Sequence, residues 1–168
     1  MSNPGSCIAG VAATLSPGCY TSIATTVTTL SSGNYYVTGS VNINTLSGSG
    51  VMIYVAPGGS LTATNNRSLT LSAPTSGTYS GVAIFQDRSN TSNFSTGNNF
   101  TLSVSGAVYM PAADVNFQNS VSFTSTGCFL FIAKSLTVKN GNGALTMNSS
   151  ACAGSYSGAG FLSFSMAE

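Results

Sequence analysis

The chain contains no His and no Trp, and only seven of its 168 residues are charged: four are Lys or Arg and three are Asp or Glu. Without histidine the commonest general base is missing. A net charge of +1 offers no electrostatic surface for nucleic acid or anionic lipid. No run of about 18 apolar residues occurs, so the sequence predicts no membrane-spanning helix. The composition therefore excludes nucleic-acid binding and a helical membrane span.

Small polar residues and glycine dominate instead. Ser, Thr and Asn number 29, 20 and 15, Gly adds 19, and 42% of the residues are hydrophobic. Because apolar residues recur throughout the chain and the net charge is low, the sequence predicts an ordered protein. The length suits one domain over residues 1–168, with an N-terminal cap at about 1–30 and a C-terminal tail at about 153–168.

Four segments share one pattern, in which a glycine precedes five nearly all-apolar residues. The segments are Gly50-VMIYV, Gly81-VAIFQ, Gly106-AVYMP and Gly127-CFLFI. Their glycines lie 31, 25 and 21 residues apart, an irregular repeat typical of solenoid turns. Three of the four are followed, after a short corner, by a strand that alternates apolar and polar residues, at 61–64, 115–118 and 136–139.

This repeated order predicts an all-β, right-handed parallel β-solenoid (β-helix), in which equivalent faces of successive turns stack on one another. A β-sandwich is the alternative, because it also consists of many short strands. The sandwich does not require a repeated order of glycine, apolar strand, corner and alternating strand.

The four cysteines lack metal-binding spacing, since there is no CxxC and no His to complete a zinc site. Among the three pairings open to them, nearest-neighbour disulfides Cys7–Cys19 and Cys128–Cys152 are favoured, and four free thiols are the alternative. Disulfides together with few charges favour an exported protein. The N-terminus has no basic segment followed by an apolar one, so we expect a mature or excised part of such a protein.

Several segments resemble the C-terminal β-rich regions of bacterial TadE/TadG-like (Flp, tight-adherence) pilus-assembly proteins. They are Leu15-SPGCY, Thr29-LSSGNYYVTGSVNIN, Ser72-APTSGTYSGVAIFQDRSN and Gly106-AVYMPAADVNF. The resemblance implies an extracellular or cell-envelope domain linked to adhesion, with envelope or pilus components as partners. It supplies no catalytic residue and no cofactor. Such proteins usually carry an N-terminal membrane anchor, which this sequence does not show.

Two internal carboxylates, Asp87 and Asp114, are the only pair that could support glycoside hydrolysis, which needs two acids about 5 to 9.5 Å apart. The interpretation favoured here is that each carboxylate satisfies groups at a turn, so the sequence predicts no enzyme. The fragment Gln86-Asp87-Arg88 is a candidate recognition corner for a carboxylate or a sugar. Its structural interpretation, in which these residues satisfy the backbone at the corner, is favoured.

Carbohydrate or ice binding is the alternative function. Ice binding by the alternating strands would need Thr at both outward positions on successive turns. Their outward pairs are Thr62/Thr64, Asn116/Gln118 and Thr137/Lys139, and only the first pair complies.

The strands that follow the glycines are apolar at both odd and even positions, so one set must face outward. The expected outward set, a candidate interaction stripe, is Met52, Tyr54, Phe85, Met110, Phe129 and Phe131. The alternating tail at 161–166, a second copy of the chain or a missing N-terminal region would cover it. We therefore expect homo-oligomers or filaments, and a non-enzymatic, cell-surface structural or adhesive module.

Overall fold

The computed structural model describes residues 4–125 and 127–139. Within these ranges the chain is all-β and contains no helix. The strands are β1 (Ile8–Gly10), β2 (Thr14–Leu15), β3 (Gly18–Ile23), β4 (Thr29–Leu30), β5 (Gly33–Val37), β6 (Ser40–Gly48), β7 (Val51–Val55), β8 (Ser60–Ser72), β9 (Val82–Gln86), β10 (Phe94–Thr96), β11 (Thr101–Phe117), β12 (Ser122–Thr124) and β13 (Phe129–Val138).

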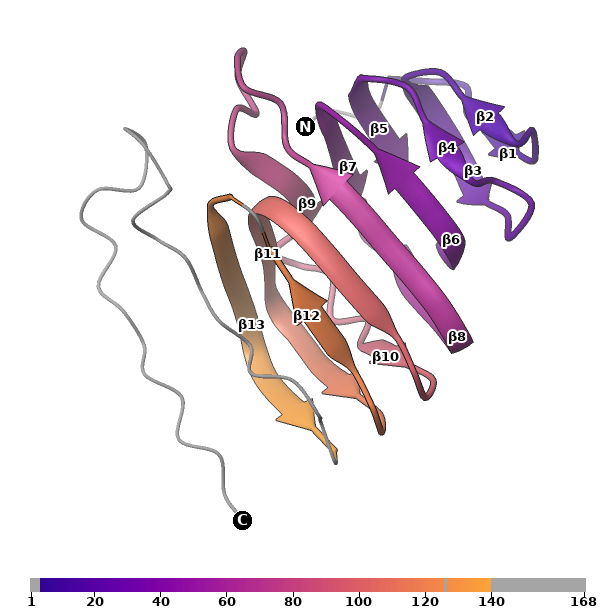
Figure 1. Cartoon of the computed structure of the whole chain (residues 1–168). Helices are drawn as coiled ribbons and strands as arrows, with labels where there is room; N and C mark the ends of the chain where they lie inside the picture. The colour runs from indigo at the N-terminus through magenta and orange to yellow at the C-terminus, as the bar shows by residue number, and fades with distance from the viewer. Residues whose placement is uncertain (1–3, 126, 140–168) are drawn as a thin grey trace.

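The strands pair in parallel and stack as a β-solenoid of about six turns (Figure 1). The predicted solenoid is confirmed. The sandwich alternative is wrong, because a sandwich is built from antiparallel sheets. Strands β1 to β4, which fall in the expected cap at 1–30, pair within the same parallel sheet.

Each complete turn contributes to three stacks of strands. The aromatic stack contains β5, β7, β9, residues 106–110 of β11 and residues 129–133 of β13. The mixed stack contains residues 40–43 of β6, 60–63 of β8, β10, 114–117 of β11 and 135–138 of β13. The hydroxyl stack contains β2, β4, residues 45–48 of β6, 68–72 of β8, 101–105 of β11 and β12.

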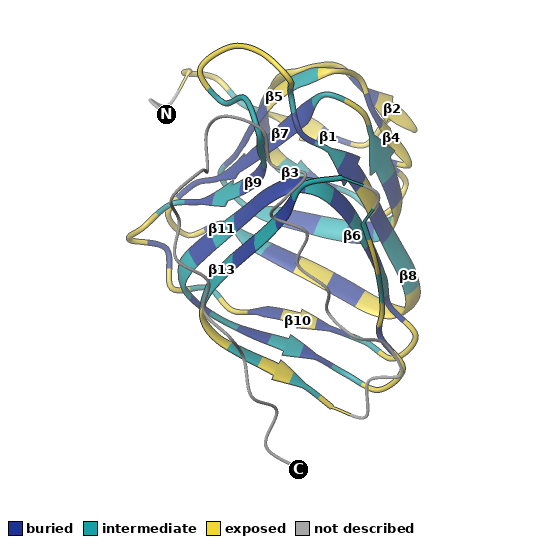
Figure 2. Cartoon of the chain, turned by 60° about the vertical axis from the view of Figure 1, so that its left-hand side comes forward, coloured by how far each residue is buried: buried dark blue, intermediate teal, exposed yellow. Residues whose placement is uncertain are grey.

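The sequence pattern maps directly onto these stacks. The strands after the four glycines form the aromatic stack, and the alternating strands at 61–64, 115–118 and 136–139 begin in register in the mixed stack. Alternation places the apolar residues inside, as the buried and exposed bands along β8 show in Figure 2. Phe94, Phe100 and Phe117 fill the later turns, with Phe94 edge-on to the other two at 6.1 and 5.9 Å between ring centroids.

The expected outward stripe is wrong at three positions: Met110, Phe129 and Phe131 lie in the interior core. The cause is a shift in register where β9 meets β11. Val82 pairs with Ala107, but Ile84 pairs with Val108, so Ala83 is an extra residue in β9. A one-residue bulge exchanges the two faces of every strand aligned beyond it. The outward residues after the bulge are therefore Tyr109 and Ile132, which align with Phe85.

The corner between the mixed and hydroxyl stacks is built from left-handed residues. Asn66, Asn99 and Ser120 have φ of 58°, 56° and 60°. Asn tolerates this conformation better than most residues. The Asn99 side-chain amide donates to Asn66 Oδ1 at 2.9 Å, so one corner is tied to the next.

Cys7 and Cys19 form the predicted disulfide, with their Cα atoms 4.6 Å apart. The second predicted pair, Cys128–Cys152, involves Cys152, which lies outside the described residues, as does the tail at 153–168. The described part of the chain contains no helix that could cross a bilayer.

Candidate hydroxyl surface

A three-residue pattern recurs along the hydroxyl stack, with a hydroxyl residue on each side of a large apolar one. Four copies that the strand pairing aligns with one another are Thr45-Leu46-Ser47, Ser68-Leu69-Thr70, Thr101-Leu102-Ser103 and Ser122-Phe123-Thr124. The central leucines are buried in the core, and Phe123 packs against it. Because side chains alternate along a strand, the flanking Ser and Thr side chains all point outward.

The strand register aligns these hydroxyls into two rows across the turns. The first row is Thr45, Ser68, Thr101 and Ser122; the second is Ser47, Thr70, Ser103 and Thr124. We call these eight residues the hydroxyl face. Thr and Ser alternate along each row and within each strand, so the threonine methyl groups form a checkerboard. Thr29 and Thr14 continue the second row toward the N-terminus.

The backbone fixes the spacing of this grid. Hydrogen-bonded strands lie about 4.8 Å apart, and residues two apart in one strand are separated by about 6.6 Å. Leu46, Leu69 and Leu102 are 1%, 0% and 2% exposed, so each strand is anchored beneath its pair of hydroxyls. Ser and Thr have short side chains, and a β-branched Thr is stiff at χ1, so little freedom remains to be lost on binding.

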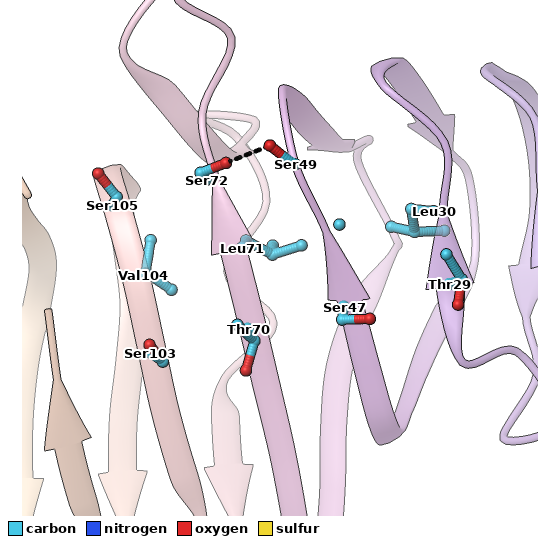
Figure 3. A pocket seen from close by; sticks show the side chains of 11 residues that line it. Thr29, Leu30, Ser47, Ser49, Thr70, Leu71, Ser72, Ser103, Val104 and Ser105 are labelled. Carbon is cyan, nitrogen blue, oxygen red and sulfur yellow. Dashed lines mark hydrogen bonds between the residues drawn. The ribbon is translucent and has the colours of Figure 1, made fainter. Parts of the chain in front are cut away.

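A groove of about 450 Å³ runs across part of this stack. Figure 3 shows Thr29, Ser47, Thr70 and Ser103 in one line across four strands, and a second line of Ser49, Ser72 and Ser105. Leu30, Leu71 and Val104 lie between the two lines. From Thr29 to Ser103 the groove crosses three inter-strand steps, or about 14 Å. Among the described residues, no charged or aromatic side chain lines it.

Most hydroxyls of the face have no partner within the described protein. Ser47 donates to the carbonyl of Thr28 at 3.2 Å, and no side-chain hydrogen bond joins the other seven hydroxyls to any described residue. In the mixed stack, Thr62 donates to Asn42 Oδ1 at 3.0 Å, while the side chains of Ser95, Asn116 and Thr137 make no hydrogen bond to a described residue. At the corner beyond this stack, Arg67 donates to Asn44 Oδ1 and to Thr64 Oγ1. Seven of the eight hydroxyls of this face thus make no side-chain hydrogen bond to a described residue and can bond an external ligand.

Sequence reasoning missed this surface. The pairs tested for ice binding lie in the mixed stack or directly after its strands: they are Thr62/Thr64, Asn116/Gln118 and Thr137/Lys139. The signal that could have found the hydroxyl face is a Thr-Leu-Ser or Ser-Leu-Thr triplet, with Phe replacing Leu at 122–124. The same triplet also occurs at 14–16, 29–31, 60–62, 70–72 and 135–137, so the sequence alone does not select the four copies that the strand register brings together.

The candidate recognition corner serves the fold. Gln86 is fully buried, and its Nε2 donates to the carbonyls of Asn90 and Ser92, both at 2.9 Å. Asn90, 2% exposed, in turn donates to the carbonyls of Ala56 and Gly59. These two amides hold the loop after β9 against the preceding turn, which matches the structural interpretation of this fragment.

Asp87 and Arg88 have local partners as well. Ser89 donates to Asp87 Oδ1 from its backbone N–H at 2.9 Å and its hydroxyl at 2.6 Å, and the Tyr54 hydroxyl donates to Oδ2 at 2.5 Å. These bonds, those of Ser89 first, lower the pKa of Asp87 to about 2. The Arg88 guanidinium lies 5.8 Å from the ring centre of Tyr109.

The two internal carboxylates belong to separate clusters. Asp114 accepts hydrogen bonds from the Ser135 hydroxyl at 2.6 Å and from Lys134 Nζ at 3.3 Å, and the Ser135 bond is the main reason that its pKa is lowered. Asp87 is bound instead by Ser89 and Tyr54. A general acid for glycoside hydrolysis requires a raised pKa, and both of these pKa values are lowered.

The outward side of the aromatic stack carries a row of rings. Tyr36, Tyr54, Phe85 and Tyr109 stack in sequence, with centroids 5.0, 5.7 and 4.9 Å apart. Tyr36 and Tyr54 are nevertheless buried, in a second cluster with Met52, against which Tyr79 of the loop before β9 packs. The chain thus covers much of the surface that the sequence predicted to be an exposed stripe.

Within the described ranges, no group of three or more His, Cys, Asp or Glu side chains could hold a metal ion. Comparisons with protein-family models, with curated proteins and with solved structures found no match. The resemblance to TadE/TadG-like proteins stays a prediction from the sequence.

Proposed function

We propose that the chain is a non-enzymatic module of an exported bacterial surface protein, with a structural or adhesive role. In this proposal it attaches to an extended, uncharged surface through the hydroxyl face. The observation that carries the proposal is the grid of eight aligned hydroxyls, seven of them without a protein partner in the described chain.

The chemistry of the surface supports attachment rather than catalysis. Its hydroxyls are neutral, and each can donate one hydrogen bond and accept others. The carboxylates Asp87 and Asp114 are engaged elsewhere and have lowered pKa values. The Cys7–Cys19 disulfide is compatible with export to an oxidising compartment. The resemblance to pilus-assembly proteins agrees with a location at the cell envelope.

The test is adsorption of the purified chain to insoluble, uncharged solids: ice, cellulose and chitin. A Thr70→Tyr variant places a bulky side chain at an exposed site in the second row, and Thr62→Tyr makes the same change on the same strand in the mixed stack. We expect retention on at least one solid, lost in Thr70→Tyr and kept in Thr62→Tyr. Retention on none, or equal loss in both variants, would refute the proposal, as would turnover of any glycan.

A further inference from the structure

We propose that the solid recognised by the hydroxyl face is ice. This inference rests on the proposed function, since it names the surface to which the same eight residues attach. Its basis is the combination of a two-dimensional hydroxyl grid, a rigid backing and a lining without charge or aromatic rings.

The grid repeats in two directions, as a crystal face does. Neighbouring hydroxyls of one row lie about 4.8 Å apart across four strands, and the two rows are about 6.6 Å apart. Both distances are of the same order as the repeats of the hexagonal ice lattice. A ligand that satisfied only one or two hydroxyls would not need this repetition, whereas a lattice contacts every member of the grid at once.

Each hydroxyl on the face can replace a water molecule in a hydrogen-bonded lattice, because it both donates and accepts. Thr70, for example, is exposed, and its hydroxyl bonds to no described residue. Water held on such a grid is already spaced by the protein, because the strand register fixes the hydroxyl positions. These water molecules are therefore already ordered on the protein before they become part of the ice crystal, which lowers the entropic cost of binding.

The lining also disfavours the other uncharged solids. Flat sugar rings are usually bound by aromatic side chains, and within the described chain none lines the groove or belongs to the hydroxyl face. The stacked rings Tyr36, Tyr54, Phe85 and Tyr109 lie on the aromatic stack, and two of them are buried. Charged polymers are disfavoured because the described residues that line the groove carry no charge.

The backing keeps the grid in place. The parallel ladder fixes the strands, and the buried Leu46, Leu69 and Leu102 prevent each strand from rotating. The corner residues Asn66, Asn99 and Ser120 each precede the first hydroxyl of their triplet by two positions, at Ser68, Thr101 and Ser122. The same left-handed corner thus comes before each of these three triplets and fixes the position at which it begins.

The experiment measures incorporation of the full chain into a slowly growing ice hemisphere and the shape of single ice crystals in its solution. We expect the wild type to enter the ice and to facet the crystals. Thr70→Tyr should reduce incorporation by about tenfold or more, since it lies in the second row of the grid. Thr62→Tyr should behave as the wild type.

Thr70→Val, which removes only the hydroxyl, serves if Thr70→Tyr does not fold, and circular dichroism checks each variant. Exclusion of the wild type from ice, or undiminished incorporation of a folded Thr70 variant, would overturn the inference. If the wild type is excluded from ice but binds cellulose or chitin in a Thr70-dependent manner, ice is wrong and the proposed function stands. If no solid shows Thr70-dependent binding, both fail.

Discussion

At the corner after β9, the Asp87 carboxylate accepts three hydrogen bonds, from Ser89 and Tyr54. Its negative charge therefore contributes to the free energy of unfolding. Its pKa is about 2 in the folded protein, against an ordinary value of 3.8. A lowered pKa means that the folded state binds fewer protons than the unfolded state. The contribution is therefore complete above about pH 4 and is lost as the pH falls through about 2.

Asp87→Asn should lower the free energy of unfolding at neutral pH by about 1 kcal/mol, because solvent screens part of the effect. It should also flatten the dependence of stability on pH between about 4 and 2. Thermal melts followed by circular dichroism across this range measure both effects. Tyr54→Phe, which removes one donor, should give an intermediate curve. An unchanged pH dependence in Asp87→Asn would contradict the assignment.

Asn99 lies at the corner that sets the start of the hydroxyl face. With φ of 56° it occupies a region that β-branched residues strongly avoid, and its side chain bonds Asn66. Asn99→Val should lower the free energy of unfolding by about 2 to 3 kcal/mol, since it adds strain and removes the hydrogen bond. Asn99→Gly removes only the bond and should cost about 1 kcal/mol. Urea denaturation distinguishes them, and equal losses would show that backbone strain is unimportant at this corner.

At the scale of strands, the bulge at Ala83 determines which residues of β13 face the core, and we therefore expect substitutions at two neighbouring positions to differ in cost. Phe131 faces the interior and is 4% exposed, whereas Leu130 faces outward and is half-buried. Phe131→Ala should cost about 3 to 5 kcal/mol, and Leu130→Ala should cost clearly less. Chemical denaturation of both variants measures the difference. A larger loss of stability in Leu130→Ala than in Phe131→Ala would contradict this register and would favour the sequence prediction that Phe131 faces outward.

The strands show where sequence reasoning succeeds and where it fails. A glycine followed by an apolar strand, a corner and an alternating strand predicted the solenoid, because stacked turns demand like residues at like positions. The pattern could not reveal whether Val108 and Met110 point inward or outward, because both faces of their strand are apolar. One extra residue at Ala83 exchanges the inward and outward residues of the strands aligned after it. The hydroxyl rows were hidden for another reason: they emerge only when the unequal turns are aligned by pairing.

For the whole molecule, the sequence predicts self-association, and the structure alters where it would occur. The chain itself buries Met52 and Tyr54, so the aromatic stack offers less apolar surface than expected. Among the described residues the exposed large hydrophobic side chains are Ile8 and Val11, at 65% and 61%, in and beside the edge strand β1. Few charges are present anywhere to oppose edge-to-edge pairing.

We therefore expect the mass measured by light scattering to rise with protein concentration. The Ile8→Lys/Val11→Lys double variant should reduce this rise, since inserted charge blocks an open strand edge. Ser76→Lys/Thr78→Lys, which adds the same charge to the exposed loop before β9, is the matched control. A constant monomer mass at high concentration, or equal effects of the two double variants, would contradict association through this edge.

The disulfide between Cys7 and Cys19 determines how the solenoid responds to mechanical force. A pull along the stack loads its turns one after another, because each turn contacts only its neighbours. Tension applied at Cys7 passes through the sulfur atoms to β3, and residues 8–18 carry none of it. The short strands β1 and β2 are thus shielded from peeling. The first hydrogen bonds to bear load are those of β3 with β5, so the six-residue strand β3, rather than β1 or β2, opposes unfolding from the N-terminal end.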